Sequence, residues 1–205
     1  MNKEPLARGS KARPPKPPIS KSDLPNRVSE LAKLEPLFTA EVISARLEAL
    51  AAEIAEIMPK DFAAVAILKG SFVFAADLIR SLTAHSVNPE VDFMTLASYG
   101  TQTVSSGTVR LLRDVEISVA GREVLLIDDI LDSGRTIDFA RRHVLERGAS
   151  AVKVCVLLDK TSGRSQAHTA DFVGFACPPA FVVGYGMDHA HKFRGLPFVA
   201  ILRQQ

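Results

Sequence analysis

Cysteine is scarce in this chain of 205 residues, which has only Cys155 and Cys177. Neither belongs to a CxxC pair or to a spacing typical of metal sites, so the sequence offers no disulfide framework and no cysteine-based zinc site. Each cysteine lies among apolar neighbours, in VKVCVLL and GFACPP. We therefore expect two buried free thiols that behave as small apolar side chains.

Long apolar runs are also missing. No stretch approaches the roughly 20 residues of a membrane-spanning helix, and the N-terminus lacks the apolar core of a signal peptide. We therefore expect no membrane association and a cytoplasmic location. With 47% hydrophobic and 23% charged residues, the composition is ordinary for a soluble globular enzyme.

The first 27 residues differ in composition from the rest. They hold seven of the Lys and Arg residues, only two acidic residues and six of the twelve prolines. This composition predicts a disordered basic extension over residues 1–27, followed by a single domain over residues 28–205. A solvated tail is the favoured interpretation, and contact with RNA or an acidic partner is the alternative. Because the remainder is slightly acidic, we expect no nucleic-acid binding by the folded part.

Apolar strands alternate with helical periodicity between residues 39 and 159. Helices are predicted at 39–58, 71–82 and 135–148, and strands at 62–70, 91–98, 109–115, 123–129 and 151–159. Strands that are apolar on both faces indicate an α/β fold, with a parallel-sheet core and helices on both faces. The polar segment 99–107 is predicted as a loop. After residue 170, short extended pieces predict a small C-terminal subdomain beside the core.

Residues 124–137, VLLIDDILDSGRTI, place three acids directly after an apolar strand. In an open parallel sheet, ligands bind at the carboxyl ends of strands, where loops lead into helices. Gly134 lets the backbone approach a ligand, and the N–H groups that open the next helix suit a phosphate, helped by the Ser133 and Thr136 hydroxyls. The adjacent acids Asp128 and Asp129 suit a sugar diol and a hard cation such as Mg²⁺. Together these groups indicate a phosphorylated ribose.

Two competing explanations of this stretch are weaker. A single Asp before a helix is usually only an N-cap, but three acids followed by Ser-Gly-x-Thr exceed what capping requires. A dinucleotide fold would carry GxGxxG and a P-loop would carry GxxxxGK[ST], and the sequence contains neither.

The stretch resembles the 5-phosphoribosyl-1-pyrophosphate (PRPP) motif of type I phosphoribosyltransferases, which is a strand, two acids and D-[ST]-G-x-T. The resemblance implies that the ribose hydroxyls of PRPP lie near Asp128 and Asp129. It also implies a 5′-phosphate site formed by Ser133, Gly134, Arg135 and Thr136.

Other segments resemble the hypoxanthine-guanine phosphoribosyltransferases, in the same order, over about residues 35–203. They are LKGSFVFAADLIR (68–80), ASYGTQTVSSG (97–107), LLDKTSGR (157–164) and the segment 171–202. The resemblance implies a type I phosphoribosyltransferase-like core with a hood. It also implies transfer of the phosphoribosyl group from PRPP to a 6-oxopurine, hypoxanthine and/or guanine, which gives IMP or GMP and pyrophosphate. Relatives are commonly dimers or tetramers, so the resemblance implies a homo-oligomer.

The same resemblance assigns the purine site. Lys160 would donate to the purine O6, Phe181 would stack on the base, and Val182 and Asp188 would contact the base edge through their backbone. The Asp188 carboxylate would approach a second Mg²⁺, beside the metal site at Asp128 and Asp129. By residue type alone, Lys160 would be taken for a surface charge and Phe181 for a core residue.

The resemblance also assigns the leaving group and the proton. Lys69, Gly70 and Arg194 would hold the pyrophosphate, with a cis peptide at Leu68–Lys69. Asp132 would act as general base at the purine N7. Ser98 and Tyr99 would belong to a lid that excludes water from the reaction.

The sequence departs from the family pattern at three positions. Asp128 stands where many relatives carry Glu, Arg135 where some carry Lys, and His189 where many carry an aromatic residue. The pair His189 and His191 is a weak metal motif without a third ligand. The choice between hypoxanthine, guanine and xanthine therefore stays open. So do two other functions, a transferase with an adenine, xanthine or pyrimidine acceptor, and a non-catalytic RNA-binding regulator.

Overall fold

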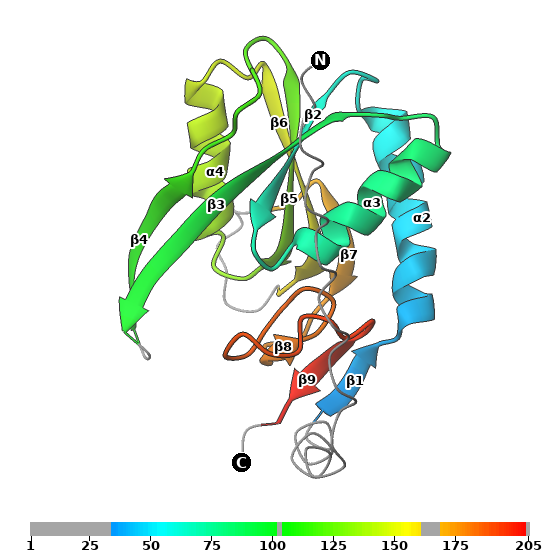
Figure 1. The fold of residues 1–205 in the computed structure, drawn as a ribbon, viewed down its shortest axis with the longest axis vertical. Helices are drawn as coiled ribbons and strands as arrows, with labels where there is room; N and C mark the ends of the chain where they lie inside the picture. Colours follow the sequence, from blue (N-terminus) through cyan, green and yellow to red (C-terminus); the bar gives the residue numbers. More distant parts are fainter. Residues whose placement is uncertain (1–33, 102–103, 161–168, 204–205) are drawn as a thin grey trace, which may run out of the picture. The chain divides into compact units, whose positions relative to one another are not determined.

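A six-stranded sheet forms the centre of the computed structural model, which describes residues 34–101, 104–160 and 169–203. The strand order is β4-β3-β2-β5-β6-β7 (Figure 1), and every neighbouring pair is parallel except β3 with β4. The strands span Ala63–Leu68 (β2), Glu90–Thr101 (β3), Val104–Arg113 (β4), Glu123–Leu131 (β5), Ala151–Asp159 (β6) and Phe172–Ala176 (β7).

Both faces of this sheet are buried against helices. In β2, Ala64 and Ala66 join a core that includes residues of α2 and α3, whereas Val65 and Ile67 join a second core with residues of α4. Successive side chains of a strand point to opposite faces, so a strand covered on both sides must be apolar throughout. The predicted parallel-sheet core with helices on both faces is confirmed.

The helices begin and end close to their predicted positions. They span Ala40–Ile57 (α2), Phe72–Ala84 (α3) and Arg135–Glu146 (α4). Thr39 is the N-cap of α2, and its hydroxyl accepts a hydrogen bond from Val42 N at 3.4 Å. Gly148, with φ of 91°, follows α4 at the position where a left-handed residue ends a helix.

A second, three-stranded antiparallel sheet has the order β1-β9-β8. It combines Leu34–Phe38 (β1) with Val182–Val183 (β8) and Val199–Leu202 (β9), so segments from both ends of the described chain build it. We call this sheet, together with residues 177–198, the hood. The central strands β2 and β5 run toward it in Figure 1, so their carboxyl ends face the hood.

Two details of the sequence prediction are wrong. Residues 172–176 were predicted in the C-terminal subdomain, but β7 extends the central sheet and pairs with β6, for example Phe172 with Cys155. The predicted loop 99–107 is largely a hairpin, because β3 and β4 continue pairing through Tyr99–Thr108 and Gly100–Ser105. Backbone pairing with a neighbouring strand outweighs the weak loop preference of Gly and Ser here.

Cys155 and Cys177 are buried free thiols, as predicted. Within the described ranges, no helix is both long enough and apolar enough to cross a membrane. The predicted extension over residues 1–27 lies outside the described residues and stays a prediction.

Candidate active site

Asp128 and Asp129 lie near the carboxyl end of β5, where the predicted ribose site should be. Asp128 is 6% exposed, and its Oδ1 accepts a hydrogen bond from Asp129 N at 3.0 Å. Burial raises the pKa of both carboxyls, and the neighbouring charge of Asp129 raises the pKa of Asp128 further. Two adjacent acids in such a place are better accommodated beside a cation. The donor set of carboxylate oxygens fits Mg²⁺.

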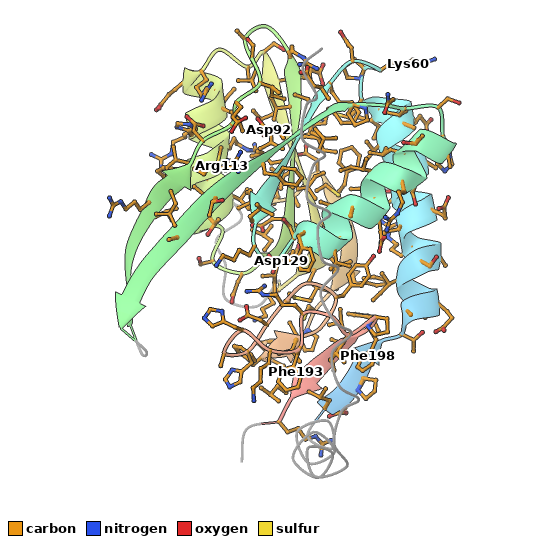
Figure 2. The ribbon with its side chains drawn as sticks, in the orientation of Figure 1. Lys60, Asp92, Arg113, Asp129, Phe193 and Phe198 are labelled. Carbon is orange, nitrogen blue, oxygen red and sulfur yellow. The ribbon has the colours of Figure 1, made fainter. Side chains whose placement is uncertain are left out.

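Gly70, in the β2–α3 loop, lies directly against Asp129. A Cβ atom on Gly70 would meet Asp129 Oδ2 at 1.8 Å, so a larger residue would displace the carboxylate. The predicted cis peptide between Leu68 and Lys69 is present. The predicted pyrophosphate loop and the predicted ribose acids therefore share one site. Figure 2 shows Asp129 between the central sheet and the hood segment that carries Phe193.

The predicted phosphate loop leads from β5 into α4. Gly134, with φ of 81°, is the N-cap residue of this helix and has no side chain to cover the N–H groups of the first turn. Asp138 N already donates to Gly134 O at 2.9 Å, so the N–H groups before it are the ones that point out of the helix. Ser133 and Arg135 are exposed beside them. The geometry is that of an anion site.

Lys160 and Asp132 come together because β5 and β6 are parallel neighbours, with Leu131 paired to Asp159. Lys160 N donates to Leu131 O at 3.0 Å, and Lys160 Nζ lies 3.4 Å from Asp132 Oδ2. The Lys160 side chain is largely buried, with 15% of its surface exposed, whereas that of Asp132 is 67% exposed. The residue predicted to bind the base and the residue predicted to take its proton are thus in contact.

The hood carries the remaining purine-site candidates. Phe181 is 44% exposed, and its ring meets that of His189 edge to face at 5.4 Å between centroids. Val182 is buried in β8 and pairs with Ile201. An exposed aromatic ring beside a fixed strand is a surface on which a planar base could stack.

Asp188 and Arg194 form an ion pair, with Arg194 Nη2 at 2.5 Å from Asp188 Oδ1. The other oxygen of Asp188 accepts a hydrogen bond from His191 N at 2.8 Å. The charge of Arg194 also works against the burial that raises the pKa of Asp129 on β5. Both Asp188 oxygens are engaged, so a metal at Asp188 would compete with Arg194 for Oδ1 and with His191 N for Oδ2.

The two lid candidates are placed only by their backbone. Ser98 pairs with Val109 and Tyr99 with Thr108, so both lie on the hairpin of β3 and β4. Sequence reasoning missed two hood contacts, the packing of Gly186 on Gly70 and the hydrogen bond from Tyr185 to Asp77. Asp77 looks like an ordinary solvated helix acid in the sequence, so no local signal marks it.

Comparison with known proteins places this site in a family. The family model described as "Phosphoribosyl transferase domain" matches residues 37–190. The chain is 43% identical over 168 residues to the hypoxanthine-guanine phosphoribosyltransferase of Bacillus subtilis, covering 82% of this chain and 92% of that protein. It is 41% identical over 158 residues to the enzyme of the same name from Streptococcus thermophilus, covering 75% and 86%.

A solved structure agrees. The crystal structure of a hypoxanthine phosphoribosyltransferase from Staphylococcus aureus superposes with a TM-score of 0.78 at 34% identity, over 84% of this chain and 94% of that chain. The resemblance inferred from the motifs is confirmed by both comparisons. The chain belongs to the hypoxanthine-guanine phosphoribosyltransferase family.

Proposed function

We propose that this chain transfers the 5-phosphoribosyl group from PRPP to hypoxanthine and/or guanine, giving IMP or GMP and pyrophosphate, in purine salvage. The observation that carries the proposal is the contact between Lys160 and Asp132, 3.4 Å apart, beside the acids of β5. It brings Lys160, which we propose to bind the purine, next to the proposed PRPP site. Both cysteines are free thiols, in keeping with the reducing cytoplasm that we predict.

On the donor side, the carboxylates of Asp128 and Asp129 orient the ribose of PRPP by accepting hydrogen bonds from its hydroxyls. The 5′-phosphate binds at the start of α4, with Ser133, Gly134, Arg135 and Thr136 around it. Mg²⁺, when bound at Asp128 and Asp129, supplies positive charge to the diphosphate that leaves. In this way the donor is fixed at both ends of its ribose.

On the acceptor side, Lys160 Nζ donates to O6 of the base, while Phe181 stacks on its ring. The backbone of Val182 and Asp188 contacts the opposite edge. Asp132 takes the proton from N7 as the purine nitrogen attacks C1′ of PRPP. Adenine carries a donor where a 6-oxopurine carries O6, so it would face Lys160 donor to donor.

At the leaving group, Lys69 and Arg194 supply positive charge while Gly70 allows close approach of the backbone. The bond between C1′ and pyrophosphate breaks as the bond to the purine forms, and the charge that develops on the diphosphate is stabilised by these cations. The lid residues Ser98 and Tyr99 close over the site and exclude water.

A homo-oligomer is part of the proposal. Phe72, at the start of α3, is 44% exposed and Phe93, on β3, is 39% exposed. Phe93 pairs with Ala66, whose side chain faces the core of α2 and α3, so Phe93 lies on the same side of the sheet as α3. Exposed aromatic residues of this kind favour association. Light scattering should give a multiple of the chain mass of 22.2 kDa, and a monomer would contradict the proposal.

A panel of bases tests the function directly. With PRPP and Mg²⁺, pyrophosphate release should occur with hypoxanthine or guanine and should be absent with adenine, because Lys160 requires an acceptor on the base. Xanthine decides how wide the specificity is. Pyrophosphate release with adenine but with neither hypoxanthine nor guanine, or release with none of the bases, would refute the proposal.

Asp132→Asn should lower kcat by about 10²- to 10⁴-fold, because the amide cannot take the N7 proton. Binding of PRPP, measured by calorimetry, should change by less than about threefold, since the phosphate loop and the acids of β5 are untouched. Glu146→Gln, an exposed acid at the far end of α4, is the matched control and should keep full activity. A kcat unchanged in Asp132→Asn would remove Asp132 from the role of general base.

Asp128→Asn should stabilise the metal-free protein while abolishing activity. A carboxyl whose folded pKa is raised binds more protons folded than unfolded, so wild-type stability falls as the pH rises above the ordinary Asp value of about 4. With EDTA present, the melting temperature of the variant should exceed that of the wild type by about 3 °C or more at pH 8 and by less at pH 5. A difference in melting temperature that does not grow with pH would contradict the raised pKa of Asp128.

A further inference from the structure

Tyr185 has a backbone conformation that residues other than glycine rarely adopt. Its φ is 48°, and it lies between Gly184 with φ of 97° and Gly186 with φ of 101°. Three consecutive residues in the left-handed region form a tight bend in the hood. The hydrogen bond from Met187 N to Gly184 O at 3.0 Å closes this bend, and Tyr185 N ties it to the chain near Leu196 by donating to Leu196 O at 2.9 Å. A tyrosine in such a place must be held by contacts elsewhere.

Those contacts lie on α3. Tyr185 is 6% exposed, and its hydroxyl donates a hydrogen bond to Asp77 Oδ2, while the other Asp77 oxygen pairs with Arg80. Burial and the neighbouring carboxylate raise the pKa of Tyr185 above its usual value, so the phenol keeps the proton that it donates. A hydrogen bond from a buried phenol to a carboxylate is stronger than one between neutral groups.

The residue next to Tyr185 touches the leaving-group site. A Cβ atom on Gly186 would meet Gly70 O at 2.2 Å, so the hood backbone lies against the β2–α3 loop. Gly186 and Arg194 are joined by two hydrogen bonds, Gly186 N to Arg194 O at 2.9 Å and Arg194 Nη1 to Gly186 O at 2.7 Å. The placement of Gly186 therefore sets how Arg194 stands relative to Gly70.

The connection closes a ring of contacts. The β2–α3 loop continues into α3 at Phe72, and Asp77 follows five residues later, a rise of about 7.5 Å along the helix. From Asp77 the hydrogen bond leads to Tyr185, and from there the backbone leads to Gly186 and returns to Gly70. A helix this short is stiff, so the tether fixes the hood relative to the loop.

We propose that Tyr185 and Asp77 are positioning residues for the leaving group, which hold the hood on α3 so that Arg194 and Gly70 face the same diphosphate. Neither side chain is assigned to a substrate. Of the proposed purine contacts, Lys160 and Asp132 follow β6 and β5, and Phe181 and Val182 are held by β9, through the pairing of Val182 with Ile201 and the hydrogen bond from Leu202 N to Phe181 O at 2.9 Å. These four contacts do not depend on the tether, whereas Asp188 lies on the hood segment that the tether holds. The proposal rests on the proposed function for the identity of the leaving group.

The test separates the two halves of the site. Tyr185→Phe keeps the ring and loses only the hydroxyl, and Asp77→Ala removes its partner. Each should raise the KM for PRPP and the dissociation constant of magnesium pyrophosphate by about five- to tenfold. The KM for the purine should stay within about twofold. Both variants remove the hydrogen bond between Tyr185 and Asp77, and Asp77→Ala also removes the pair with Arg80. The double variant should therefore be no worse than Asp77→Ala alone.

Ser81→Ala is the matched control on α3. It removes the hydrogen bond from Ser81 Oγ to Glu48 Oε1 at 2.7 Å, which ties α3 to α2 and does not reach the hood. It should lower stability without changing pyrophosphate binding.

Several results would overturn the proposal. They are unchanged pyrophosphate binding in both variants, an equal rise in the KM of purine and PRPP, or additive losses in the double variant. Pyrophosphate binding is measured by calorimetry without turnover. It therefore tests the effect of the hydrogen bond between Tyr185 and Asp77 even if the enzyme accepts no base. Absence of turnover in the wild type would instead count against the proposed function.

Discussion

The repulsion between two neighbouring carboxylates, the buried Asp128 and the half-buried Asp129, is the constraint on which the rest of this site depends. Asp128 and Asp129 lie near the carboxyl end of β5, among apolar residues, and burial works against the charge of each. A nearby cation reduces this cost, since the charge of Arg194 offsets part of the rise in the pKa of Asp129. Gly70 also leaves room for the Asp129 carboxylate, which a side chain at position 70 would displace. A positively charged ligand at this place would stabilise the charged form of both carboxyls.

The two halves of the site are built differently. The proposed ribose and phosphate positions, with Lys160 and Asp132 at the base, lie at the carboxyl ends of β5 and β6, where parallel pairing fixes their spacing. The proposed leaving-group position is assembled from the β2–α3 loop and the hood, which meet where Gly186 packs on Gly70. The first half is therefore rigid by topology, whereas the second depends on side-chain contacts. This difference accounts for the separate effects that we expect on PRPP and on the purine.

Most of the fold could be predicted from local pattern. The apolar run 151–159 forms β6 with the predicted bounds, and helical spacing placed α2 and α4 within a few residues. The errors concern pairing partners, which depend on residues distant in the sequence. Phe172–Ala176 has the composition of any short strand, and only β6 decides that it extends the central sheet. In the same way β1 joins β9 from the other end of the described chain.

The candidate site was predictable where chemistry is local. Three acids and a Ser-Gly-Arg-Thr segment at the end of a strand are enough by themselves to predict a binding site for a phosphorylated sugar. The acceptor residues came from resemblance, because Lys160 and Phe181 look ordinary in isolation. The tether from Tyr185 to Asp77 could not be predicted, since it joins two segments whose proximity follows only from the folded hood. Functional contacts of that kind carry no sequence periodicity.

The central claim is that one site holds PRPP and a 6-oxopurine side by side, with Lys160 and Asp132 on the base and the acids of β5 on the ribose. A crystal structure with PRPP, Mg²⁺ and a hypoxanthine analogue that lacks the attacking nitrogen tests it most directly. The account predicts Lys160 Nζ within hydrogen-bond distance of O6, Asp132 at the N7 edge, and the cation at Asp128 and Asp129. A base bound with O6 away from Lys160, or a ribose away from these acids, would contradict it.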